Sequence, residues 1–144
     1  MDNGEKEIDI DATLISILKD RFGFDAFRGA QLDIIRHVSG GQDGLVVMPT
    51  GAGKSLCYQL PALARGGLAL VVSPLLALMK DQVDALQAKG IRATTINSTV
   101  SSAQRRERMR GLLHGEYELL YVSPERFNPH FLDLIKKMDI RLFA

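Results

Sequence analysis

Residues 46–63 have the sequence VVMPTGAGKSLCYQLPAL, in which an apolar run meets a glycine-rich turn and then a helical pattern. Gly51 and Gly53 permit backbone torsions and close approaches that a Cβ would block, so successive N–H groups can converge on an anion. The helix expected over 54–64 would direct its N-terminal N–H groups to the same place. The segment therefore predicts a phosphate-binding loop between a buried strand and a helix.

This loop contains the side chains that a bound nucleotide would need. Lys54 would reach the outer phosphates and the Ser55 hydroxyl would ligate Mg²⁺, which makes both candidate catalytic residues. The strict pattern G-x-x-x-x-G-K-[ST] has glycine where this chain has Met48. The alternative is a glycine-rich turn that binds nothing. The candidate phosphate site comprises Thr50, Gly51, Ala52, Gly53, Lys54 and Ser55.

Apolar runs of strand length alternate with helical patterns along the rest of the chain. Strands are expected at 44–48, 68–73, 93–97, 119–123 and 141–144, and helices at 11–21, 30–38, 54–64, 75–89, 101–114 and 127–137. Fully apolar strands are typical of parallel sheets that are covered on both sides. The order predicts an α/β fold, with a parallel sheet and helices on both faces.

Length, composition and net charge limit the classes of protein to which this chain can belong. A chain of 144 residues is long enough for one domain with a real core. The formal net charge of +1 gives no global electrostatic argument for nucleic acid, so any polyanion site must be local. Cys57 is the only cysteine and the acidic N-terminus lacks a secretory signal, which favours a cytoplasmic location. No apolar run approaches the roughly 18 residues of a membrane span.

Upstream of the phosphate loop, FGFDAFRGAQ (22–31) contains Phe24, Arg28 and Gln31 just before the second expected helix. A glutamine amide can donate and accept at the adjacent polar positions of adenine's edge. An aromatic ring or a guanidinium could cover the face of the base. The alternative is that the phenylalanines are core residues and Arg28 a surface charge. Together with the phosphate loop, the segment indicates ATP rather than GTP.

Five stretches, in the same order and at similar spacing, resemble the opening of the helicase core of RecQ-family DNA helicases. The resemblance runs from about Leu18 to Ala144, and the stretches are FGFDAFRGAQLDII, LVVMPTGAGKSLCYQLPAL, VVSPLLALMKDQVDAL, INST and LLYVSPERF. It implies an ATP-dependent 3′-to-5′ DNA helicase that acts in recombination and repair, with ATP and Mg²⁺ as cofactors. It also implies a RecA-like P-loop NTPase domain over 23–144, preceded by a helical segment over 1–22.

The same resemblance assigns roles to residues in the adenine-binding site and in the DNA-binding site. It implies that Phe24 stacks on adenine, Arg28 contacts it and Gln31 binds the base edge, although the family's Pro-Gly is replaced here by Gly29 and Ala30. In the stretches with Ser-Pro pairs it implies contacts with single-stranded or partly duplex DNA. Each pair could instead simply end a strand and start a helix. These candidate DNA contacts are Ser73, Pro74, Ser123 and Pro124.

Catalysis needs acidic residues that these 144 residues do not supply. Hydrolysis requires carboxylates to hold Mg²⁺ and position water, and no Asp-Glu pair follows any apolar strand here. The resemblance places a D-E-A-H sequence almost immediately after the strand that RLFA resembles. We therefore expect a piece that stops before this motif, lacks one strand of the sheet, the second motor domain and the accessory modules, and cannot hydrolyse ATP.

Two other functions stay open from the sequence. A small-molecule kinase or other P-loop NTPase would share the loop and the fold, and a helicase-derived module without catalysis could bind nucleic acid or protein. The basic run QRRERMR (104–110) could touch phosphates, but a solvated helix face is the simpler interpretation. His37, His114 and His130 lack ligand spacing and are assigned to no metal. A compartment with DNA follows from the resemblance: the bacterial nucleoid or a nucleus.

Overall fold

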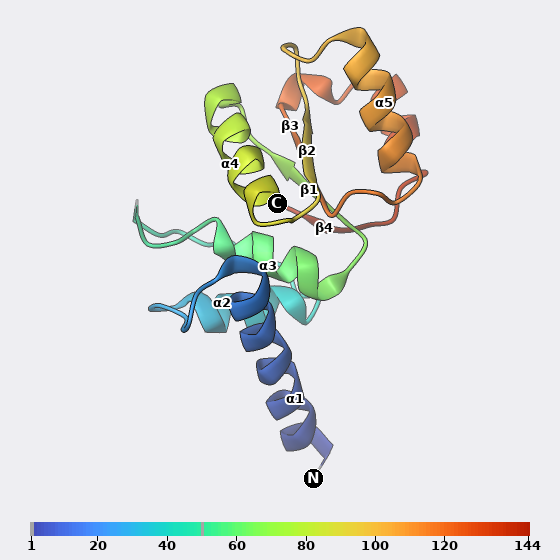
Figure 1. Cartoon of the computed structure of the whole chain (residues 1–144). Helices are drawn as coiled ribbons and strands as arrows, with labels where there is room; N and C mark the ends of the chain where they lie inside the picture. The colour runs from blue at the N-terminus through green and yellow to red at the C-terminus, as the bar shows by residue number, and fades with distance from the viewer. Residues whose placement is uncertain (1, 50) are drawn as a thin grey trace. The chain divides into compact units, whose positions relative to one another are not determined.

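The computed structural model describes residues 2–49 and 51–144, and within 2–9 only the backbone. The chain divides into two compact units, Met1–Arg65 and Gly66–Ala144. Figure 1 labels the helices and strands. The helices of the first unit are α1 (Asp2–Ile17), α2 (Gln31–Ser39) and α3 (Leu56–Arg65), with a π-helical turn at Leu18–Phe22.

The first unit is helical because its apolar residues recur at helical spacing. Leu14, Leu18 and Phe22 lie four residues apart, are all buried, and cover one side of α1 and of the π-helical turn that follows it. Ile35 of α2 and Leu60 of α3 are also fully buried. Both α1 and α2 pack against α3. The expected helices at 11–21 and 30–38 are therefore confirmed, and α1 begins earlier than the sequence predicts.

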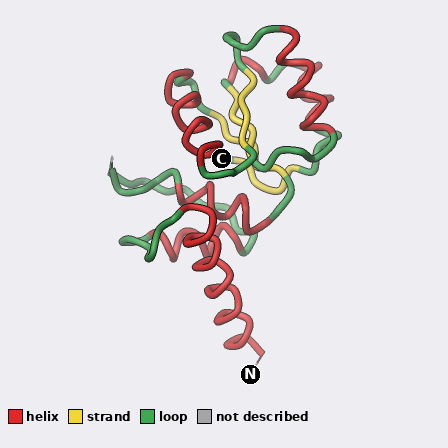
Figure 2. The backbone as a smooth tube through the Cα atoms, viewed as in Figure 1, coloured by secondary structure: helices red, strands yellow, loops and turns green. Residues whose placement is uncertain are grey.

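The second unit contains a four-stranded sheet in the order β2-β3-β1-β4, in which every pair is parallel (Figure 2). This confirms the predicted α/β class. Each strand lies where an apolar run indicated one: β1 (Leu68–Val72), β2 (Ala93–Ile96), β3 (Leu119–Val122) and β4 (Ile140–Phe143). The helices between them are α4 (Leu76–Ala88), α5 (Ser102–Leu113) and α6 (Pro129–Ile135), with a 3₁₀ turn at Pro124–Arg126.

Helices cover both faces of this sheet. Successive side chains of a strand point to opposite faces, and Leu68, Leu70 and Leu120 belong to a cluster with Leu112 of α5 and Phe131 of α6. The intervening strand residues face the other side, where α4 packs against β2 and β3. Figure 1 shows α4 and α5 on opposite sides of the strands. The prediction of a sheet covered on both faces is confirmed.

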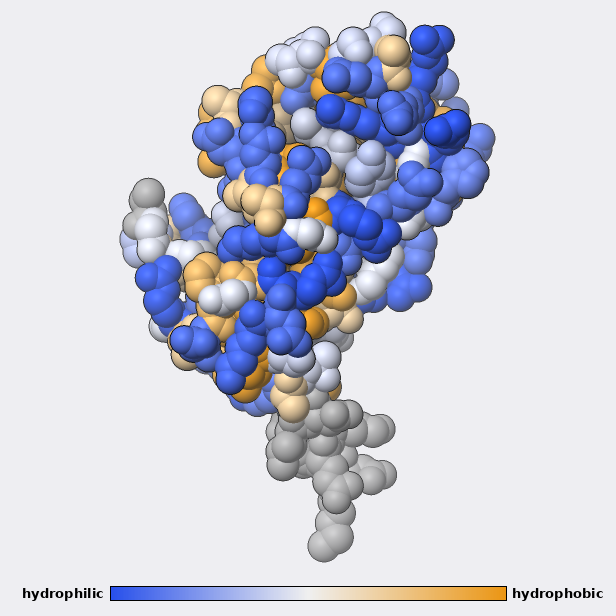
Figure 3. All heavy atoms as spheres, viewed as in Figure 1, coloured by the Kyte–Doolittle hydropathy of each residue, from blue (hydrophilic) through white to orange (hydrophobic). Residues whose placement is uncertain are grey.

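Local capping explains where two of these helices begin. At the start of α5, the Ser101 hydroxyl accepts from the Gln104 N–H and the Gln104 side chain accepts from the Ser101 N–H, both at 3.2 Å. At the start of α6, Asn128 Oδ1 accepts from the Phe131 N–H at 2.9 Å, with Pro129 next in the chain. Figure 3 shows hydrophilic side chains gathered over α5, as expected for the basic run.

The strand expected at 44–48 is a wrong prediction. These residues have no regular secondary structure and pair with none of the four strands, and Leu45 and Val47 are 92% and 89% exposed. A strand is held by ladder hydrogen bonds to a neighbour, so an apolar run without such a neighbour does not become one. The helix after the loop also begins later than expected, at Leu56 rather than Lys54.

Candidate nucleotide and DNA sites

The phosphate loop has the backbone conformation that its glycines predict. Gly51 and Gly53 have φ angles of +83° and +77°, which residues with a Cβ rarely adopt. Between them, the Ala52 N–H donates to the Pro49 carbonyl at 3.2 Å and closes a turn. Thr50, the first residue of the predicted phosphate site, lies outside the described residues.

Lys54 and Ser55 join this turn to α3. The Lys54 side chain is exposed and Ser55 is half-buried. Their carbonyls accept from the N–H groups of Cys57 and Gln59, each at 3.0 Å, so the backbone already follows a helical path before Leu56. The Lys54 cation thus stands on a flexible stem beside the N-terminal turn of α3, where the helix dipole favours negative charge.

Gln31 connects the predicted adenine segment to the phosphate loop. Its side chain is only 3% exposed. Its Oε1 accepts from the backbone N–H of Arg28 at 2.9 Å, and its Nε2 donates to the Gly53 carbonyl at 3.2 Å. Because one partner is a donor and the other an acceptor, the orientation of the amide is fixed. The structure thus brings together two stretches that are 22 residues apart.

A Cβ at position 53 would displace the buried Gln31 amide, so the contact and the positive φ together favour glycine there. A Cβ built on Gly53 would lie 2.2 Å from Gln31 Nε2 and 3.4 Å from Arg28 Nη2. Arg28 is exposed, with its guanidinium near the loop, and Phe24 is 49% exposed on the surface. Of the three predicted adenine residues, the structure therefore holds two against the loop. Gly29 has a φ of +52°, so the turn before α2 uses a left-handed residue there.

Cys57 lies beneath the loop and has a packing role. It is 6% exposed, and its Sγ lies 3.8 Å from the Gly53 carbonyl oxygen and 3.9 Å from Met48 Sδ. Burial raises the pKa of the Cys57 thiol. The neutral thiol is the form favoured at this position, as expected for a small apolar residue rather than a nucleophile.

In the second unit, the two Ser-Pro pairs lie side by side at the carboxyl ends of β1 and β3. The Ser73 N–H donates to the Val122 carbonyl at 3.0 Å, and the Ser73 hydroxyl accepts from the Leu75 N–H at 3.3 Å. Pro74 and Pro124 are exposed, whereas Ser123 is fully buried. Ser73, Pro74 and Pro124 are therefore at least partly accessible at this edge of the sheet, whereas Ser123 is not.

Three other features that could indicate a function are a metal site, a membrane-spanning helix and the basic run. Within the described residues, no three His, Cys, Asp or Glu side chains lie close enough together to hold a metal ion. In the same part of the chain, no helix is both long and apolar enough to cross a membrane. The basic run lies on α5, and Arg106 and Arg110 are exposed, while Arg108 donates from Nη1 to the Thr95 carbonyl at 2.7 Å.

Sequence reasoning did not identify the backbone groups that orient Gln31. They are the Arg28 N–H and the Gly53 carbonyl, and neither depends on side-chain identity. One local signal was available: Gln31 is the first residue of α2, where a side-chain acceptor can bond a nearby N–H of the preceding turn. The contact with Gly53 is tertiary and left no local signal.

Comparisons with known proteins found a family model and relatives that match most of this chain. The model of the DEAD/DEAH box helicase family matches residues 28–142. An ATP-dependent DNA helicase RecQ from Haemophilus influenzae is 54% identical over 133 residues, which are 92% of this chain and 22% of that protein. The RecQ helicase of Bacillus subtilis is 47% identical over 90% of this chain, and a probable helicase RecS from the same organism is 46% identical over 85%. The chain spans 22–25% of the length of these relatives.

Proposed function

Because this chain belongs to the DEAD/DEAH box helicase family, we propose that it is the ATP-binding part of a RecQ-like DNA helicase. In the whole protein, ATP binding and hydrolysis would drive 3′-to-5′ movement along DNA during recombination and repair. The observation that carries the proposal is the bonding of Gln31 to the Gly53 carbonyl of the phosphate loop. This hydrogen bond joins Gln31, the proposed base-binding residue, to the proposed phosphate-binding loop.

The amide of Gln31 supports selection of adenine. A glutamine amide has two N–H groups and two acceptor lone pairs. Among the described residues, one N–H and one lone pair are used by Gly53 and Arg28, which leaves one of each. Adenine offers an acceptor at N7 and a donor at N6, whereas guanine offers acceptors at both positions. Against guanine the amide oxygen would face an acceptor in either orientation of the amide, so ATP is favoured over GTP.

The phosphate loop would bind the triphosphate together with Mg²⁺. Gly51 and Gly53 both have a positive φ, which favours glycine and lets the backbone of the loop turn sharply toward an anion. Lys54 would bind the outer phosphates and Ser55 would ligate Mg²⁺, while Phe24 and Arg28 would cover the base. When bound, Mg²⁺ would neutralise phosphate charge.

DNA would bind in the second unit. Pro74 and Pro124 are exposed at the carboxyl ends of β1 and β3, and the Ser73 hydroxyl, which accepts from the Leu75 N–H, can donate its own hydrogen to a phosphate. Because Ser123 is fully buried, it does not contact the DNA strand in this proposal. We further propose a second motor domain and accessory modules in the whole protein, which would act in the bacterial cytoplasm or a nucleus.

The test is calorimetric titration of the 144-residue chain with ATP and with GTP in the presence of Mg²⁺. We expect heat with ATP only, and its loss in Gln31→Ala and Lys54→Ala. Gln42→Ala serves as the control, because Gln42 is exposed and lies outside the proposed site. Equal binding of both nucleotides, or unchanged ATP binding in Lys54→Ala, would contradict the proposal. Titration with single-stranded DNA, in which Ser73→Ala should weaken binding, tests the second part separately.

A further inference from the structure

Helix α5 carries a positive charge that no ion pair neutralises within the described residues. Residues 104–110 contain four arginines and one glutamate, which gives this stretch a formal charge of +3. Elsewhere in the described part of the chain, ion pairs with acidic side chains hold Arg36, Lys80, Arg92, Lys136 and Arg141. No such pair includes a residue of α5 there. Arg106 and Arg110, which are four residues apart, therefore repel each other on the helix without a counter-charge.

The first turn of α5 lies at the edge of the sheet where the proposed DNA contacts are. Because every pair of strands is parallel, the carboxyl ends of β2, β3 and β1 lie in a row in that order. Ser73 follows β1, Ser123 follows β3, and residues 97–101 lead from the carboxyl end of β2 into α5. The helix ends before β3 begins, so it runs from the carboxyl edge of the sheet toward the amino edge (Figure 1).

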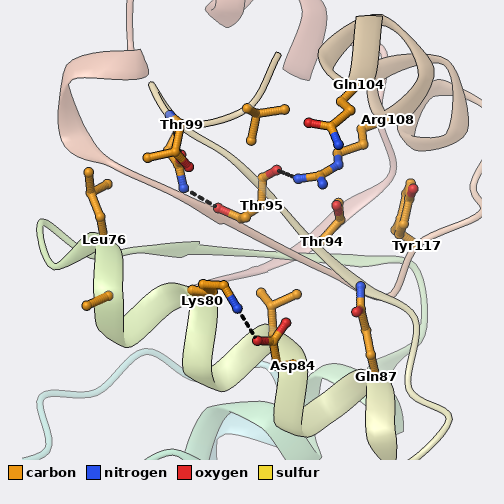
Figure 4. Close-up of a pocket in the computed structure, with 14 residues that line it drawn as sticks. Leu76, Lys80, Asp84, Gln87, Thr94, Thr95, Thr99, Gln104, Arg108 and Tyr117 are labelled. Carbon is orange, nitrogen blue, oxygen red and sulfur yellow. Dashed lines mark hydrogen bonds and ion pairs between the residues drawn. The ribbon is translucent and has the colours of Figure 1, made fainter.

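Two of the four arginines lie on the turns of α5 nearest to this carboxyl edge. Arg108 lies farther along, where its Nη1 donates to the Thr95 carbonyl at 2.7 Å. Figure 4 shows this guanidinium directed at Thr95, with Gln104 on the preceding turn, beside a cavity of about 410 Å³. Arg105 is half-buried on the same side of α5 as Arg108, since they are three residues apart, and Arg106 is exposed. Both precede Arg108, and helical side chains lean toward the N-terminus, so both guanidinium groups are nearer the carboxyl edge.

The positive charge at this end of α5 comes from the arginine side chains rather than from the helix N-terminus. The Gln104 N–H already donates to the Ser101 hydroxyl, and the Ser101 N–H donates to the Gln104 side chain, so the capping box satisfies these groups. A guanidinium offers five N–H donors in a planar fork that matches the oxygens of a phosphate. Arginines that bind phosphates in this way position a nucleic-acid strand without reading its bases.

We propose that Arg105 and Arg106 bind phosphates of a single DNA strand that continues from the Ser73 edge, past β3, to α5. The inference rests on the DNA-binding part of the proposed function and extends it to a second contact surface. β3 alone separates β1 from β2, so the DNA has to cross about 10 Å at the usual spacing of strands. Along this path the 3₁₀ turn after β3 carries Glu125 and Arg126, whose charges offset each other. Continuity with the Ser73 edge favours DNA over an acidic protein as the occupant.

The test measures binding of the 144-residue chain to a fluorescently labelled oligothymidine by anisotropy, over a series of salt concentrations. The variant Arg105→Gln/Arg106→Gln removes the two proposed phosphate contacts and keeps polar side chains at both positions. The matched control is Arg110→Gln/Lys137→Gln, which removes the same charge from the last turn of α5 and from the segment before β4, at exposed positions away from the carboxyl edge. Ser73→Ala reports on the first part of the path.

We expect the logarithm of the affinity to fall less steeply with the logarithm of the salt concentration in Arg105→Gln/Arg106→Gln. The slope should be smaller by about 1.4, since each phosphate contact with a single strand contributes about 0.7. The control should keep the wild-type slope. Ser73→Ala should weaken binding without a change of slope, because a hydroxyl carries no charge. A strand of mixed sequence should show the same loss as oligothymidine, because phosphate contacts carry no sequence information.

An unchanged slope in Arg105→Gln/Arg106→Gln, or an equal change in the control, would overturn the proposal. If Ser73→Ala still weakens binding in that case, the proposed DNA edge stands and only its extension to α5 fails. If the wild-type chain binds no oligothymidine even at low salt, both fail, and the ATP titration is independent of them.

An acidic protein partner is tested with labelled polyglutamate. Loss of polyglutamate binding in Arg105→Gln/Arg106→Gln, with DNA binding unchanged, would also overturn the proposal. If circular dichroism shows that this double variant is unfolded, Arg106→Gln alone is used, because Arg106 is exposed. It is judged by a change of slope of about 0.7.

Discussion

Substituting Gly53 by alanine tests how the base-binding and phosphate-binding stretches are joined. The new Cβ would lie 2.2 Å from Gln31 Nε2, so the buried amide must move and lose its bond to the Gly53 carbonyl. Gly51→Ala is the matched control, because Gly51 has a similar φ of +83° and no atom within 4 Å of its Cβ position. Both variants carry the strain of a positive φ, about 1–2 kcal/mol.

The two variants should therefore differ by the contact alone. Leaving a buried amide without its partner costs about 1–3 kcal/mol, so Gly53→Ala should lower the free energy of unfolding by that much more than Gly51→Ala. Urea unfolding followed by circular dichroism measures both. In a Gln31→Ala background the difference should disappear, since the clashing atoms are gone. Equal costs in the wild-type background, or a difference that persists without Gln31, would refute the reasoning.

Three further predictions concern an ion pair, the thiol and the core. Arg36 donates from Nε to Asp11 Oδ1 at 2.7 Å and holds the pKa of Asp11 below its ordinary value of 3.8. At pH values above 3.8 the ion pair therefore adds about 0.2–1 kcal/mol to the free energy of unfolding, as is usual for exposed groups, and this contribution is lost as the pH falls through the lowered pKa of Asp11. In Arg36→Ala the free energy of unfolding should not show this loss at acid pH. Cys57, buried and with a raised pKa, should react with iodoacetamide at least about tenfold more slowly in the native chain than in urea, and equal rates would contradict its packing. Leu120→Ala should cost about 2–5 kcal/mol, since Leu120 is 0% exposed at the centre of the sheet; a loss under about 1 kcal/mol in urea unfolding would contradict this.

The positions of the strands and helices in the second unit could be predicted from the sequence, because the patterns that indicate them are local. Continuous apolar runs marked β1 and β3, and β-branched Thr94, Thr95 and Ile96 marked β2. The order of the strands in the sheet was not predicted, because pairing between distant segments depends on tertiary contacts. Residues 44–48 have the same apolar composition, yet Leu45 and Val47 are exposed. Composition indicates that a segment can form a strand, and a pairing partner decides whether it does.

For the candidate site, residue types were predicted better than contacts. The glycines at 51 and 53 were expected to adopt unusual torsions, and both have positive φ. The bond from Gln31 to Gly53 was not expected, because it links segments whose separation in sequence carries no spacing rule. The buried state of Ser123 was also missed, since a Ser-Pro pair looks alike whether its hydroxyl faces inward or outward.

Hydrogen exchange of the 144-residue chain, with and without ATP and Mg²⁺, tests the central claim most directly. If the first unit contains both the base-binding and the phosphate-binding group, ATP should slow exchange in residues 28–31 and 51–57 together. GTP should protect the second stretch less and the first stretch not at all. Protection confined to the second unit, or to neither stretch, would contradict the claim that these residues form one ATP site.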